Sequence, residues 1–216
     1  MPEPTWSVVV PVKRLPAAKS RLRGALPAVP HEELALALVA DTVRAVLACA
    51  AVAEVLVVTD DARAAAELGR TGARVVPDAP DAGLNAAFRH GAAAAGRHAR
   101  VAGLTADLPA LRPAELAAAL RAASAGPPGV RRFVADAPGS GTVLLTAPAG
   151  VPLDPRFGVA SAAAHAASGA LPLGGDWPTL RRDVDTAEDL ATAARLGLGP
   201  RTAALTGARP AAATPG

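Results

Sequence analysis

The chain has 216 residues, 51% of them hydrophobic and 19% charged, a composition that suits one globular domain with a sizeable core and argues against disorder. The net charge is only +3, aromatic residues make up 2% and the arginines are dispersed, which argues against a nucleic-acid-binding surface. The sequence shows no secretory signal and no apolar run of the roughly 18 residues that a membrane span needs, so with the single Cys49 it predicts a reducing, cytoplasmic location without membrane contact.

Short β-branched runs alternate with helical patterns along the chain. Strands are predicted at residues 6–12, 54–59, 73–77, 100–105, 130–135, 142–146 and 180–184. Helices are predicted at residues 30–50, 62–70, 83–97 and 161–167, from Pro113, and after Asp185. This alternation predicts an α/β fold: a single three-layer domain with a mixed, mostly parallel sheet. We expect the domain to span residues 1–199 and residues 200–216, rich in Ala, Pro and Thr, to form a disordered tail.

Ligands of such sheets bind at the carboxyl ends of the strands. That rule selects five segments of this chain: residues 13–21, 59–61, 78–85, 105–107 and 183–185. The dinucleotide motif G-x-G-x-x-G does not follow the first strand, and neither does a phosphate loop ending in Gly-Lys-Ser/Thr. The two common classes of nucleotide-binding α/β protein are therefore disfavoured.

A cationic loop follows the first strand instead. Lys13, Arg14, Lys19 and Arg21 fall within nine positions, and these two lysines are the only ones among 22 basic residues. A compact ammonium group in this place suits a polyphosphate ligand better than a wide guanidinium. The alternatives are an ordinary solvated basic loop and a compositional bias that spared two lysines.

Two acidic sites lie at the ends of predicted strands. Asp107 closes the strand at 100–105, and Asp183-Val-Asp185 closes the strand at 180–184. Carboxylates that converge beside a cationic loop are a setting for Mg²⁺, which binds one or two carboxylates together with phosphate oxygens. Asp107 and Asp183 are favoured as ligands, since Asp185 could instead cap the last helix in a capping box with Glu188.

Six motifs in order resemble a known family. They are Val-Pro-Val-Lys13-x5-Lys19-Ser-Arg21-Leu, Gly83-Leu-Asn85-Ala-Ala, Ala106-Asp107-Leu-Pro-Ala-Leu, Gly141-Thr142, Pro155-Arg-Phe-Gly158-x-x-Ser161 and Asp183-Val-Asp-Thr-x-x-Asp-Leu190. Over residues 6–197 the chain resembles the guanylyltransferases of deazaflavin coenzyme biosynthesis. That family includes the 2-phospholactate and phosphoenolpyruvate enzymes of the coenzyme F420 pathway, and the actinobacterial phosphoenolpyruvate type is the most similar.

The resemblance implies a Rossmann-like fold of the nucleotide-diphospho-sugar transferase type and a set of site residues. Lys13, Lys19 and Arg21 would act in catalysis and, with Asn85, bind the nucleotide. Asp107, Asp183 and Asp185 would hold Mg²⁺. Thr142, Gly158 and Ser161 would hold the phosphorylated acid. The nucleotide loop departs from the wider superfamily because it lacks its glycines, so the groups that read the base are hard to place and are expected to be backbone atoms.

The implied reaction joins GMP from GTP to phosphoenolpyruvate, giving enolpyruvyl-diphospho-5′-guanosine and pyrophosphate. The expected partners are GTP and a small phosphorylated carboxylic acid, with room for contact with a downstream transferase of the pathway. 2-Phospho-L-lactate and 3-phosphoglycerate stay open as the acid, since they differ from phosphoenolpyruvate by small groups. The rival functions are a D-x-D glycosyltransferase and a non-catalytic nucleotide-binding module. His165, four residues after Ser161, is either a structural residue or part of the acid site, and Arg156 is a candidate for the acid's carboxylate.

Overall fold

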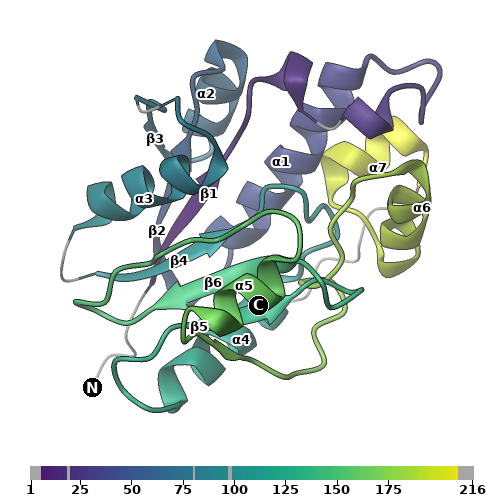
Figure 1. Cartoon of the computed structure of the whole chain (residues 1–216). Coiled ribbons are helices and arrows are strands. Elements are labelled where there is room, and N and C mark those ends of the chain that lie inside the picture. Colours follow the sequence, from purple (N-terminus) through teal and green to yellow (C-terminus); the bar gives the residue numbers. More distant parts are fainter. Residues whose placement is uncertain (1–5, 19, 80, 97–98, 209–216) are drawn as a thin grey trace.

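A seven-stranded mixed sheet forms the centre of the molecule in a computed structural model that describes residues 6–18, 20–79, 81–96 and 99–208 (Figure 1). The strand order is β3-β2-β1-β4-β6-β5-β7. The strands are β1 (Trp6–Pro11), β2 (Val52–Val58), β3 (Arg74–Val76), β4 (Arg100–Leu104), β5 (Arg132–Ala135), β6 (Thr142–Ala147) and β7 (Leu171–Pro172). Only β6 runs antiparallel to its neighbours, β4 and β5. The predicted fold class is confirmed.

Helices cover both faces of the sheet. They are α1 (His31–Leu47), α2 (Ala62–Gly69), α3 (Leu84–Ala95), α4 (Pro113–Ala125), α5 (Ser161–Ala167), α6 (Ala187–Leu196) and α7 (Pro200–Thr206), with short 3-10 turns at Leu15–Ala17 and Ser20–Leu22. The apolar side chains of α1, α2 and α4 pack in one core cluster, and those of α3 pack in a second one with the loop that precedes α5. A third cluster joins α6 and α7 to α1. These packing groups give the three-layer arrangement in Figure 1.

Strand β1 is apolar from Val8 to Pro11 because apolar clusters cover both of its faces. Val8 and Val10 pack in the cluster of α1 and α4, whereas Val9 packs in the cluster of α3. A strand covered on both faces has no solvent side to mark with polar residues. Helix α3 lies close to this strand at Gly91, where a Cβ atom would fall 2.4 Å from a Val9 methyl group, so this position requires glycine.

Two sequence predictions are wrong. Residues 180–184 form no strand. Instead of pairing with a neighbouring strand, the N–H groups of Thr179 and Leu180 donate to one carboxylate oxygen of Glu115, at 2.9 and 3.1 Å. Residues 200–206 form helix α7 and no disordered tail, because the buried carboxylate of Asp41 accepts the first N–H groups of that helix. Residues 209–216 lie outside the described part of the chain.

No helix among the described residues combines the length and the apolar character that crossing a bilayer requires.

Candidate active site

The loop after β1 is held by one aspartate. Asp61, the N-cap of α2, accepts the Ala64 N–H at Oδ1 and the Leu15 N–H at Oδ2, both at 2.9 Å. Burial on its own would raise the pKa of Asp61, but these backbone donors outweigh it and lower the pKa. The carboxylate therefore stays charged and ties the start of the cationic loop to the end of β2.

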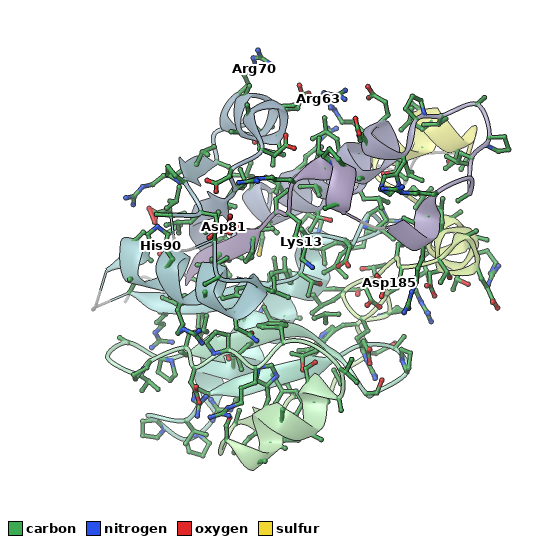
Figure 2. All side chains as sticks on the ribbon, turned by 45° about the horizontal axis from the view of Figure 1, so that its top comes forward. Lys13, Arg63, Arg70, Asp81, His90 and Asp185 are labelled. Atoms are coloured by element: carbon green, nitrogen blue, oxygen red, sulfur yellow. The ribbon has the colours of Figure 1, made fainter. Side chains whose placement is uncertain are left out.

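A cavity of about 440 Å³ opens at the carboxyl ends of β1 and β4. It brings together four predicted site residues from three distant segments: Lys13, Arg21, Asp107 and Asp185. In Figure 2 Lys13 lies at the centre of this edge, between Asp185 on one side and Asp81 on the other. Lys19 lies outside the described residues. The strand-end rule thus located the cationic loop and Asp107 correctly, whereas Asp185 reaches the cavity although the strand predicted before it does not form.

Backbone contacts hold the two acidic segments next to each other. The Val184 N–H donates to the Asp107 carbonyl at 3.1 Å, and the Leu108 N–H donates to Thr42 Oγ1 on α1 at 2.9 Å. The N-cap of α6 is Thr186, in a capping box with Asp189. The alternative that Asp185 caps this helix is therefore wrong, and Asp185 is an exposed residue that lines the cavity.

The donor set around the cavity fits a divalent cation. Asp107 and Asp185 both line the cavity, and Mg²⁺ is commonly bound by one or two carboxylates together with substrate phosphates. The described residues contain no group of three or more His, Cys, Asp or Glu side chains that would hold a metal without a substrate. Asp183 does not line the cavity, and its role as a ligand stays a prediction.

Thr105 is a site residue for which the sequence predicted no role. It lines the cavity at the end of β4, and its buried hydroxyl oxygen has no hydrogen-bond partner within the described part of the chain. A buried polar atom without a partner is costly, so a ligand oxygen is its natural partner.

A second cavity, of about 240 Å³, adjoins the first. The two share Lys13 and Leu84, and Asp60, Asp78 and Asp81 line the second one. Arg14 lies 3.7 Å from a carboxylate oxygen of Asp60 and at the same distance from one of Asp81. Burial first, and then the charges of Asp60 and Asp81, raise the pKa of Asp78. The sequence predicted that segment 78–85 faces a ligand, but it assigned no role to Asp78 or Asp81.

One of the predicted acid-binding residues contacts a buried histidine. Thr142 begins β6 and its buried Oγ1 lies 2.9 Å from Nδ1 of His165, which is completely buried in α5. Ser161, also buried, begins the same helix. Gly158, at φ +137°, adopts a conformation that favours glycine in the loop between them. His165 thus contacts one predicted acid-binding residue, and its part in the acid site stays a prediction.

Asn85 connects this loop to α3. Its side-chain amide donates to the Phe157 carbonyl at 3.0 Å and accepts the Phe157 N–H at 2.8 Å. The Phe157 ring stacks on Phe88, which lines the first cavity, with ring centroids 4.2 Å apart. Asn85 therefore supports the acid loop, a role that the sequence did not suggest, and its predicted contact with the nucleotide stays a prediction. Arg156 is directed to Asp154, at 3.3 Å.

Known proteins resemble this chain at the level of both sequence and fold. The model of the MobA-like NTP transferase domain matches residues 20–151. The phosphoenolpyruvate guanylyltransferase of Salinispora arenicola is 75% identical over 202 residues, which cover 94% of each chain. That of Geodermatophilus obscurus is 60% identical over 212 residues, covering 95% of this chain and 96% of its own.

Solved structures support the fold alone, since their sequence identity is low. A nucleotidyl transferase from Methanothermobacter thermautotroptrophicus superposes with a TM-score of 0.64 at 23% identity, covering 89% of this chain and 97% of its own. A nucleotide-diphospho-sugar transferase from Desulfovibrio desulfuricans gives a TM-score of 0.62 at 19% identity, covering 88% and 86%.

Proposed function

The chain belongs to the phosphoenolpyruvate guanylyltransferase family, and we propose that it transfers the GMP unit of GTP to phosphoenolpyruvate and releases pyrophosphate. In the coenzyme F420 pathway this reaction supplies the nucleotide-activated acid. The observation that carries the proposal is the cavity in which Lys13 and Arg21 face Asp107 and Asp185. A single thiol, the buried Cys49, agrees with a reducing cytoplasm as the compartment we propose.

The reaction is a displacement at phosphorus. A phosphate oxygen of phosphoenolpyruvate forms a bond to the α-phosphorus of GTP, while the bond from that phosphorus to the oxygen bridging to the β-phosphate breaks. Because the attacking oxygen is already anionic near neutral pH, no general base is required. The obstacle is repulsion between two polyanions, which Lys13 and Arg21 reduce by binding and orienting the phosphates. Lys19 is proposed to assist them from the same loop.

Asp107 and Asp185 are the residues proposed to hold Mg²⁺ at this edge, with Asp183 as a further candidate. When bound, the cation would neutralise charge on the nucleotide phosphates. The hydrogen bond from Val184 joins the two acidic segments and the one from Leu108 anchors the Asp107 segment to α1 before any ligand binds, which limits the reorganisation that binding requires.

The second cavity is proposed to receive the guanine base. It opens from Lys13, where the phosphates are proposed to lie, and one carboxylate oxygen of Asp78 is buried there without a hydrogen-bond partner among the described residues. Guanine presents adjacent N–H donors that a carboxylate can accept. This proposal replaces backbone groups, which the sequence suggested, with side-chain carboxylates as readers of the base.

Pyrophosphate release tests the proposed function. The protein is incubated with GTP and, in turn, phosphoenolpyruvate, 2-phospholactate and 3-phosphoglycerate, and mass spectrometry identifies the product. We expect the highest kcat/KM with phosphoenolpyruvate. Preference for another acid would correct the substrate. GTP binding without pyrophosphate release would favour the non-catalytic module, and turnover of nucleotide sugars in place of GTP would favour a glycosyltransferase.

Removing either cavity carboxylate is the matching residue-level test. We expect Asp107→Asn and Asp185→Asn each to lower kcat by about 100-fold or more, because the charge that offsets phosphate repulsion depends on them. Glu54→Gln, the same chemical change in the first half of β2 and outside both cavities, is the control and should leave kcat unchanged. Near-normal turnover by both cavity variants would contradict the metal assignment.

A further inference from the structure

His165 has two ring nitrogens with different partners. The backbone N–H of Arg156 donates to Nε2 at 2.9 Å, and Thr142 Oγ1 lies 2.9 Å from Nδ1. The ring is completely buried, with the Phe157 ring edge-on to it at a centroid distance of 5.1 Å. Neither nitrogen has access to water, so the protein alone decides which of them carries the proton.

The Arg156 contact settles that choice. A backbone N–H can only donate, so Nε2 must offer a lone pair. The neutral ring therefore carries its proton on Nδ1, and Nδ1–H donates to Thr142 Oγ1. Burial, and after it the positive charges of Arg131 and Arg156, lower the pKa of His165 to about 4, which agrees with a neutral ring near pH 7.

The direction of this hydrogen bond determines what Thr142 can offer a ligand. With one lone pair occupied by Nδ1–H, the Thr142 hydroxyl must direct its own proton elsewhere. In the opposite tautomer the hydroxyl would donate to the ring and present only lone pairs to a bound anion, which would repel it. The start of β6 lies next to the end of β4, where the first cavity opens, because Leu144 pairs with Leu104.

The same side chain also fixes the acid loop. Its bond to the Arg156 N–H holds the residue two positions before Gly158, and its own helix begins at Ser161. Asn85 holds the intervening Phe157 from the other side. The imidazole thus contacts Thr142 directly and is linked to Gly158 and Ser161 through the neighbouring backbone.

We propose that His165 is a positioning residue that makes the Thr142 hydroxyl a hydrogen-bond donor toward the phosphorylated acid and holds the Gly158 loop against it. This inference rests on the proposed function, since it assumes that Thr142 binds the acid.

Two substitutions separate the two nitrogens. His165→Gln can retain an acceptor near the Nε2 position for the Arg156 N–H but loses the donor to Thr142, whereas His165→Asn places an amide donor near the Nδ1 position. We expect His165→Gln to raise the KM for phosphoenolpyruvate about tenfold, the usual size of one lost hydrogen bond to a charged ligand, and to leave the KM for GTP within about twofold. His165→Asn should raise the acid KM by a clearly smaller factor. An unchanged acid KM in His165→Gln, or equal rises for both substrates, would overturn the proposal.

Coupling to Thr142 is the second measurement. Thr142→Val should raise the acid KM to a similar extent, and the double variant with His165→Gln should show no further rise, because both changes remove the same donor. Multiplicative effects would contradict the proposal. Activity of the wild-type protein with GTP and an acid is measured first, and its absence contradicts the proposed function and this inference together. If the wild type is active but the effects of the two substitutions on the acid KM multiply, the inference alone is contradicted.

A measurement on the unmodified protein covers the case in which a variant fails to fold. In ¹⁵N-histidine NMR spectra the proton of His165 should be found on Nδ1, the rarer tautomer of free histidine. A proton on Nε2 would overturn the proposal whatever the variants do.

Discussion

Asp78 lines the second cavity, which we propose receives the guanine base. One of its oxygens is buried without a partner among the described residues, and its N–H donates to Asp60 Oδ1 at 2.9 Å. We expect Asp78→Asn to lower the preference for GTP over ATP in kcat/KM by about tenfold, because the amide turns one acceptor into a donor facing guanine. Competition assays with both nucleotides measure this, and Glu54→Gln again serves as the control. An unchanged ratio would move base recognition away from Asp78.

His165 also makes stability depend on pH. Its pKa is lowered to about 4 in the folded protein by burial, with Arg131 and Arg156 adding to the effect and Asp154 opposing it, whereas an unfolded histidine titrates near 6.5. Below pH 6.5 the unfolded chain binds a proton that the folded chain refuses, so stability is full above that pH and falls as the pH approaches 4. At pH 4.5 the loss should be about 2–3 kcal/mol relative to pH 7.

Urea unfolding of the wild type and of His165→Asn at the two pH values isolates this contribution from that of the carboxylates, which both proteins share. The variant should lose less stability between pH 7 and 4.5. Parallel losses in the two proteins would mean that the imidazole titrates normally.

At the scale of elements, local patterns predicted the helices and strands whose signals lie within themselves. Helix α5 begins and ends at the predicted residues. The failures share a cause. Leu180 and Val184 are both buried, which looks like a strand, but the N–H groups of this segment go to Glu115 and to the Asp107 carbonyl, about 65 to 77 positions away. No short window of sequence contains those partners.

The candidate site divides in the same way. Lys13 and Asp107 could be found because they end strands, and strand ends of a parallel sheet share an edge. The partners of Asn85 and His165 could not, because the amide of Asn85 meets Phe157 across 72 positions and the tautomer of His165 depends on a backbone N–H. The sequence left Asp185 open between metal ligand and helix cap, because the true capping box of Thr186 and Asp189 repeats the same pattern one residue later.

At the scale of the whole molecule, one reversed strand brings the two proposed substrate sites to one edge. Because β6 runs against β4, its first residue, Thr142, lies where β1 and β4 end. The first cavity, where we propose that the nucleotide binds, lies at the ends of parallel strands, and the predicted acid-binding residue Thr142 lies at the beginning of the antiparallel one. A fully parallel sheet would place the first residue of that strand at the opposite edge, away from Lys13.

Helix α7 ties the end of the described chain to the wall of the first cavity. Asp41, 4% exposed on α1, accepts the N–H groups of Arg201 at 3.1 Å and Thr202 at 2.7 Å. Leu38, one turn earlier on α1, lines the first cavity, and α1 and α7 pack in one apolar cluster with Leu34 and Ala203. Ending the chain at residue 199 would leave a buried carboxylate without its donors and uncover that cluster.

We therefore expect a chain ending at residue 199 to be less stable by about 3–5 kcal/mol than a chain ending at residue 208, the last residue that the structure describes. Thermal unfolding compares the two, and the KM for GTP should rise in the shorter chain because α1 loses its support. Asp41→Asn in the chain ending at 208 gives the contribution of the carboxylate alone and should fall between them. Equal stability of both truncated chains would mean that α7 adds nothing to the domain, as its Ala- and Pro-rich sequence suggested.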